Sequence, residues 1–188
     1  MDLIVTHGIP GTRAAKGATT TIPILMASVA DPVAAGLVAS FARPGGNVTG
    51  IAFLAHELAA KRLQLLKEAL PRLQRAAVLS NSRNAAYSDA MFDAMQAAAA
   101  ALQVQLQRFD APDPASYEAV FAQMAARRQE AVAITEEATF IAQAQRLAAL
   151  AQQQRLPSVG NKEYAQAGGL IGYGANRDAI FRRAAGMA

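Results

Sequence analysis

Residues Ile22–Gly50, IPILMASVADPVAAGLVASFARPGGNVTG, form the stretch that decides the fold. The stretch begins with an apolar run typical of a buried strand, and Asp31-Pro32 ends that run. The small residues of Val33–Ala42 predict a short helix, and a glycine-rich turn then leads to a second strand over Asn47–Phe53. A strand, a helix and another strand in this order predict a parallel sheet, and open parallel sheets bind ligands at the carboxyl ends of their strands.

The same alternation of strands and helices continues along the chain and predicts further right-handed βαβ units. In the helix predicted at His56–Leu70, Leu58, Leu65 and Leu66 share the apolar face, and Lys61 and Arg62 are expected outside it. Strands are expected at Leu3–Thr6, Ile22–Val29, Asn47–Phe53, Ala76–Ser80, Gln103–Phe109, Ala131–Thr135, Leu156–Val159 and Gly168–Tyr173. The other helices are expected from Thr12, as the capping residue, to Ala18, and at Val33–Ala42, Ala85–Leu102, Pro114–Arg127, Phe140–Gln154, Glu163–Ala167 and Arg177–Ala188.

These elements predict an α/β protein with parallel-sheet lobes, one complete and one partial. Residues 1–50 supply too few strands for a complete lobe and form a partial first lobe. Residues 51–167 form the second lobe, and residues 168–188 cross back to the first. The glycine-rich passages Gly45–Gly50 and Gly168–Gly174 are the expected crossovers, and Gly45–Gly50 is the candidate hinge.

The composition is that of a globular protein and excludes several kinds of site. The chain has 188 residues, 53% of them hydrophobic, and no cysteine, so disulfides, thiolate metal sites and a cysteine nucleophile are excluded. The net charge is +4, but the arginines are dispersed and lie beside no aromatic stacking cluster, which indicates solvated helix faces and no nucleic-acid partner. No signal peptide is visible, and no apolar run approaches the roughly 20 residues that cross a bilayer.

The sequence indicates no enzyme, no cofactor and no metal site. His7 and His56 are its two histidines, and they belong to no Ser-His-Asp pattern. Glu136 and Glu137 are adjacent, so their side chains point apart in an extended segment. Neither PGG at 44–46 nor GGLIGYG at 168–174 opens a helix in the manner of a phosphate-binding loop.

Candidate ligand residues lie in the turns after the predicted strands, and the first two turns each have a structural alternative. Thr6, His7 and Gly8 place backbone amides at a helix start, which suits an anionic group, although a plain turn explains them equally well. Ser28 to Asp31 form the second turn. Asp31 can accept a ligand ammonium or cap a helix that has proline in its first position, and both roles can hold together.

The turn after the strand Ala76–Ser80 carries amide and hydroxyl groups. Asn81, Ser82 and Asn84 can bind both ends of an amino acid, although asparagine and serine are also common turn formers. Tyr87 can pack against an apolar ligand or simply begin the next helix.

The last candidates follow the remaining strands. Glu137 comes after Ala131–Thr135, where its charge also suits a helix N-terminus. The set is completed by Gly160, Asn161 and Tyr173, at the ends of the last two strands.

The stretch VADPVAAGLVASFARPGGNVTG resembles a segment of the ABC-transporter substrate-binding proteins of the tryptophan/tyrosine-binding-like group. Further matches cover nearly the whole chain in order: DLIVTHGIPGTRAAK, ELAAKRLQLLKEALP, RAAVLSNSRNAAY, LPSVGNKEYAQAGGLIGYGAN and FRRAA. The resemblance implies the type I periplasmic-binding fold, in which three-layer α/β lobes are joined by a hinge and hold a ligand between them. The family's proteins are longer, which implies a chain truncated at both ends.

The resemblance also implies roles for individual residues. It implies that the loop Thr6-His7-Gly8 contacts the ligand, and His7 departs from the small polar residue usual there, which implies altered specificity. It implies that Glu137 matches an acidic residue that grips a ligand amine. It also favours a ligand role over plain turn chemistry for the residues after Ala76–Ser80.

The leading hypothesis is therefore the solute-binding component of an ABC importer. It captures a small molecule, such as an apolar or aromatic amino acid, and docks on a membrane permease. The full-length protein is expected to be periplasmic or lipid-anchored and extracytoplasmic, and exposed sheet edges in the partial lobe predict a homo-oligomer. Two alternatives stay open: a ligand-sensing regulatory domain of the same fold, and an α/β isomerase-type enzyme.

Overall fold

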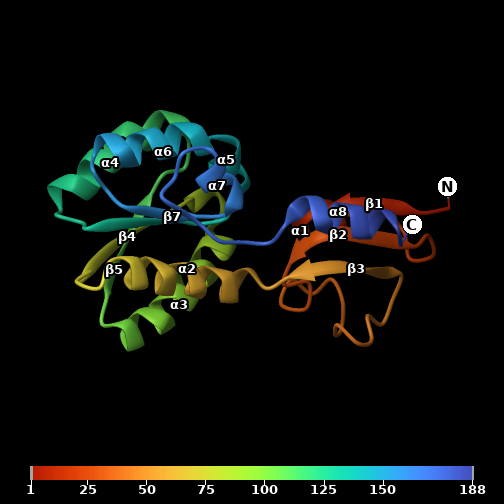
Figure 1. Ribbon diagram of the computed structural model, residues 1–188. Coiled ribbons are helices and arrows are strands. Elements are labelled where there is room, and N and C mark those ends of the chain that lie inside the picture. Colours follow the sequence, from red (N-terminus) through yellow and green to blue (C-terminus); the bar gives the residue numbers. More distant parts are fainter. Residues whose placement is uncertain (1, 188) are drawn as a thin grey trace. The chain divides into compact units, whose positions relative to one another are not determined.

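A computed structural model describes residues 2–187 and divides the chain into two compact units (Figure 1). The first unit comprises Met1–Ala55 and Ala175–Ala188, and the second comprises His56–Gly174. Each unit has its own parallel sheet with helices on it. Residues 45–50 lie inside the first unit, and residues 168–174 end at the boundary of the second.

The sheet of the first unit has the order β1-β2-β3, with β1 at Ile4–His7, β2 at Ile24–Ala30 and β3 at Val48–Phe53. The central strand β2 is almost wholly buried, and its alternate residues face opposite layers. Met26 belongs to one apolar cluster with residues of α1 (Gly8–Ala18), whereas Leu25 contributes to another with Ala184 of α8 (Arg177–Ala185). This strand is therefore the core of a three-layer arrangement.

Two predicted elements of the first unit are wrong. No helix forms over residues 33–42. The segment is a series of turns in which Gly36 has a φ of +67°, a left-handed conformation that ends a right-handed helix. Helix α1 begins at Gly8, so Thr12 lies inside it and does not cap it. The Thr12 hydroxyl donates instead to the Gly8 carbonyl, at 2.9 Å, and lies 2.8 Å from Oγ1 of Thr6.

The sheet of the second unit has the order β5-β4-β6-β7-β8, and neighbouring strands are parallel. These strands are β4 (Arg75–Ser80), β5 (Gln105–Asp110), β6 (Ala131–Ile134), β7 (Ser158–Gly160) and β8 (Ile171–Gly172). Helices α2 (Ala55–Ala69) and α3 (Ala85–Leu102) cover one face, and α4 (Tyr117–Ala126) and α6 (Ala144–Gln153) cover the other (Figure 1). Short helices η1 (Ser82–Asn84), η2 (Pro114–Ser116), α5 (Ala138–Ala142) and α7 (Lys162–Gln166) lie in the connections.

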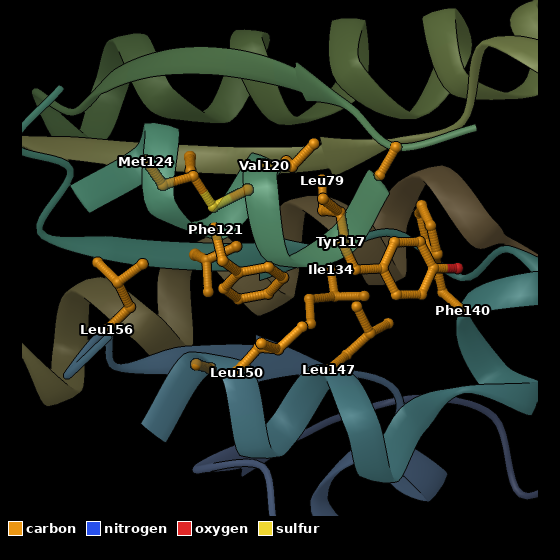
Figure 2. Close-up of a cluster of buried hydrophobic side chains, with 14 of the residues drawn as sticks. Leu79, Tyr117, Val120, Phe121, Met124, Ile134, Phe140, Leu147, Leu150 and Leu156 are labelled. Atoms are coloured by element: carbon orange, nitrogen blue, oxygen red, sulfur yellow. The ribbon is translucent and has the colours of Figure 1, made fainter. Parts of the chain in front are cut away.

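The main core lies between the sheet and the helices α4 and α6. Figure 2 shows Leu79 and Ile134 from the sheet among apolar side chains of both helices. The rings of Tyr117 and Phe140 pack edge to face, with their centroids 5.9 Å apart. The predicted core positions of α4 are confirmed as buried: Tyr117, Val120, Phe121 and Met124. The single helix predicted over residues 140–154 is instead two helices, α5 and α6, separated at Gln143.

Arg62 of α2 departs from its predicted position. The sequence places it outside the apolar face, but only 2% of its side chain is exposed. It lies on the buried stripe of the helix with Ala59, Leu63 and Leu66. A charged residue in this position requires a compensating partner, and Glu136 supplies it.

Candidate functional site

The strand order of the second unit has a switch point between β4 and β6. From β4 the chain continues outward through α3 to β5, and from β6 it continues in the opposite direction to β7. Sheets with this strand order bind ligands at the carboxyl ends of the two strands where the direction reverses. The residues that follow those strands are polar: Asn81, Ser82 and Asn84 after β4, and Thr135, Glu136 and Glu137 after β6.

Three of the predicted residues meet across this switch point. Nδ2 of Asn84 donates to Oε1 of Glu137 at 2.6 Å. Nδ2 of Asn81 donates at 3.2 Å to Oγ1 of Thr139, whose hydroxyl donates to Oε2 of Glu137 at 3.1 Å. Amide and carboxylate groups from two neighbouring turns therefore form one hydrogen-bonded network.

Asn81 and Glu137 also have the structural roles that the sequence offers as alternatives, because each caps a short helix. Oδ1 of Asn81 accepts from the amide of Arg83 at 3.0 Å and caps η1. Glu137 caps α5 by accepting from the amide of Thr139 at 3.4 Å. Both side chains are almost fully buried, so their atoms are held in fixed positions.

The two other candidates of the β4 turn point to different places. Ser82 is joined to Asp110 at the end of β5 by two bonds of 2.7 Å, one from its amide and one from its hydroxyl. Tyr87 is directed toward the β6 turn, where its hydroxyl donates to the carbonyl oxygen of Glu136 at 3.0 Å.

The ends of β7 and β8 bring together Gly160, Asn161 and Tyr173. The amide of Tyr173 donates to the carbonyl of Gly160 at 3.0 Å, and 40% of the Tyr173 residue is exposed. A Cβ at position 160 would lie 2.7 Å from the ring of Tyr164, so only glycine fits there. Oδ1 of Asn161 accepts from the amide of Tyr164 at 2.9 Å and caps α7. Nδ2 of Asn161 is buried and has no acceptor in the described part of the chain.

The candidates of the first unit lie at the ends of β1 and β2. His7 precedes α1 without capping it through its side chain, and its ring centroid lies 5.6 Å from that of Phe181 in α8. Gly8 has a φ of +67°. Thr6 is bonded to Thr12 inside α1, so its hydroxyl is engaged within the unit.

The end of β2 and the turn that follows it have an unusual backbone. Ser28, which the sequence places in the turn, lies instead inside β2. Ser28 and Asp31 have φ values of 63° and 40°, in the left-handed region that residues with a side chain rarely adopt. The register between β2 and β3 shifts between Ala27 and Val29, which marks a bulge. Oδ1 of Asp31 accepts from the amide of Ala34 at 3.0 Å, so Asp31 caps a turn. The predicted role as a helix cap is wrong, because no helix forms over residues 32–42. Strained residues of this kind concentrate at ligand sites.

Sequence reasoning missed the buried pair formed by Arg62 and Glu136. Nη2 of Arg62 lies 2.6 Å from Oε2 of Glu136, and each side chain is 2% exposed. Nε of Arg62 also donates to the carbonyl oxygen of Tyr173 at 2.6 Å. The pair thus joins the turn after β6 to the segment after β8. Among residues 2–187, no group of three histidine, aspartate or glutamate side chains could hold a metal ion.

The sequence model of the family described as "ABC transporter substrate binding protein" matches residues 1–188. The chain belongs to this family. Its members are substrate-binding proteins and not enzymes. The family resemblance and the prediction that this chain is not an enzyme are therefore confirmed. Along residues 2–187, no helix combines the length and the apolar character needed to span a membrane.

Solved structures of similar proteins confirm the α/β fold with parallel sheets. A conserved domain protein from Vibrio cholerae is 26% identical with a TM-score of 0.87; the match covers 98% of this chain and 62% of that one. An ABC domain from Streptococcus pneumonia, solved in complex with L-Trp, is 22% identical with a TM-score of 0.83; the match covers 99% of this chain and 64% of that one.

A curated relative is similar over a shorter region. The "Tyrosine-binding protein" of Clostridioides difficile (strain R20291) is 43% identical over 82 residues, which are 43% of this chain and 23% of that protein. The chain therefore spans less than two thirds of the length of the relatives it matches.

Proposed function

We propose that this substrate-binding protein is the solute-binding component of an ABC importer and that it captures an aromatic or other apolar amino acid. The observation that carries the proposal is the network of Asn81, Asn84 and Glu137 at the switch point of the second unit. It places amide and carboxylate groups where sheets of this strand order bind small molecules.

The chemistry of these groups fits the two charged ends of an amino acid. Oε1 of Glu137 accepts one bond, from Asn84, and has a further lone pair for a ligand ammonium. The buried Nδ2 of Asn161 is a donor that a ligand carboxylate can satisfy. The exposed side chain of Tyr173 offers an apolar surface with a polar end, which suits the side chain of the ligand. Residues 6–8 and 28–31, around the ends of β1 and β2 in the first unit, remain further candidate contacts.

The names of two relatives support an aromatic ligand. One solved relative holds L-Trp, and a curated relative is named for tyrosine binding. The full protein would act outside the cytoplasm, in a periplasm or anchored to lipid, and would deliver its ligand to an ABC permease.

Calorimetric titration with L-tryptophan, L-tyrosine and the other amino acids tests the proposal. A free ligand concentration of 100 times the dissociation constant should stabilise the protein by about 2.7 kcal/mol, which a thermal-shift assay detects. Glu137→Gln removes the charge that attracts the ammonium. Asn161→Asp keeps the capping atom but replaces the free donor with an acceptor, so it should weaken binding without loss of α7.

The control is Glu118→Gln, which neutralises an exposed carboxylate on α4 and should leave binding unchanged. A protein that binds none of the amino acids would refute the ligand class. Wild-type affinity in both Glu137→Gln and Asn161→Asp would refute the site.

A further inference from the structure

The guanidinium of Arg62 holds two segments that lie far apart in the sequence of the second unit. Its Nη2 pairs with Glu136 in the turn after β6, and its Nε donates to the carbonyl of Tyr173 after β8. We propose that Arg62 is a positioning residue that fixes both segments in their ligand-binding conformation. This inference rests on the proposed amino-acid site, because Glu137 and Asn161 are the groups positioned.

The turn after β6 depends on Glu136 for its conformation. Glu136 precedes Glu137 directly, and its carbonyl oxygen accepts from the hydroxyl of Tyr87. On its other side, Oγ1 of Thr135 donates to the carbonyl of Leu79 at 2.9 Å. Arg62 adds the bond to the Glu136 side chain, so the turn is held from α2, α3 and β4 together.

The segment after β8 is equally close to Arg62. A Cβ at Gly174 would lie 3.0 Å from Nη2 of Arg62 and 3.6 Å from Cβ of Asn161. The guanidinium therefore passes beside Gly174, close to the Asn161 turn. The amide of Tyr173 is bonded to Gly160, so the Arg62 bond to the Tyr173 carbonyl also steadies the end of β7.

Stability alone does not require a buried ion pair in this position. Apolar side chains of similar volume often replace such pairs without loss of stability, because the desolvation of two charges offsets their attraction. A planar guanidinium offers what apolar packing lacks, namely two donors in a fixed fork that bind two acceptors at once. The geometry thus favours a role in orientation.

The test uses the double variant Arg62→Met/Glu136→Leu in the full chain, with native-state hydrogen exchange and titration with L-tryptophan and L-tyrosine as probes. The exchange measurement follows the amides of Glu137 and Tyr173, which donate to Thr135 and Gly160. The matched control is Arg75→Met/Glu130→Leu, a partly exposed pair at the amino ends of β4 and β6, whereas the proposed site lies at their carboxyl ends. Arg62→Lys is a second variant, which keeps the charge but loses the fork.

We expect the double variant to fold with a stability close to that of the wild type, while the amides of Glu137 and Tyr173 exchange at least about tenfold faster than in the control. Its affinity for the bound amino acid should fall at least about tenfold, because the ligand must then order the two segments itself. Arg62→Lys should accelerate exchange at Tyr173.

Wild-type exchange at both amides would overturn the proposal, and so would a double variant that fails to fold, because the pair would then serve folding itself. If the wild type binds none of the amino acids, the proposed ligand class fails, and the exchange rates still decide the role of Arg62.

Discussion

Replacement of Arg62 by methionine is expected to destabilise the second unit by about 3–5 kcal/mol. Both side chains of the pair are 2% exposed and their charged atoms are 2.6 Å apart, so water cannot replace the lost cation beside Glu136. The Tyr173 carbonyl loses a donor as well. A total stability of about 5–15 kcal/mol is typical of a domain, so this single change should be readily measurable.

The double variant Arg62→Met/Glu136→Leu should recover most of that loss, because it removes both charges together. Arg146→Met provides the comparison with an exposed pair, since the side chains of Arg146 and Glu118 are 41% and 56% exposed. That variant should cost far less stability than Arg62→Met, because solvent screens exposed charges.

Urea unfolding followed by tyrosine fluorescence measures these differences in the relevant unit. The chain has no tryptophan, and its four tyrosines all lie within His56–Gly174: Tyr87, Tyr117, Tyr164 and Tyr173. The signal therefore reports the second unit alone. A loss for Arg62→Met no greater than that for Arg146→Met would refute the reasoning, because the ion pair would then behave as a hydrated one.

Two further predictions concern alkaline stability and association. Burial raises the pKa of Tyr164 from 10.0 to about 12, so the folded state favours the neutral phenol. The contribution of the buried phenol to stability is therefore fully present below pH 10 and is lost as the pH rises through 12. Between pH 10 and pH 12 the wild type should lose about 2 kcal/mol more than Tyr164→Phe in urea unfolding. Strands β1 and β3 each pair only with β2 among the described residues, and Val5 on β1 is 59% exposed. Light scattering should give a mass that is a multiple of 19.7 kDa, and Val5→Lys should lower that mass. A wild type with the mass of a monomer would contradict association through these edges.

Local periodicity was sufficient to predict most elements of the fold. Helix α3 has the predicted bounds, and the buried positions of α4 follow the predicted spacing. Residues 33–42 show where local reasoning fails. Their composition suits a helix, but Gly36 adopts a left-handed conformation, and Lys16 of α1 donates to the carbonyls of Gly36 and Leu37 at 2.9 Å. Those carbonyls are thus bonded to another element, which no local pattern reveals.

The candidate site also has a part that local sequence patterns predict and a part that they do not. The turns after β4 and β6 could be predicted because parallel strands end at one edge of a sheet, but the strand order that places β4 beside β6 could not. Arg62 and Glu136 are 74 residues apart in sequence, so no local pattern pairs them. A usable signal was present in α2, where Arg62 interrupts a stripe formed by Ala59, Leu63 and Leu66.

Capping and ligand binding are compatible roles for Asn81, Glu137 and Asn161. Each residue caps a short helix with one oxygen. In the proposed site, Nδ2 of Asn161 and a lone pair on Oε1 of Glu137 serve the ligand, whereas Nδ2 of Asn81 donates to Thr139 and holds the network together. A capped side chain is already immobile, so a ligand does not bear the cost of about 0.5–1.5 kcal/mol for ordering it. The caps therefore preorganise the polar groups, and an oriented amide or carboxylate at the end of each strand is what recognition of a small zwitterion requires.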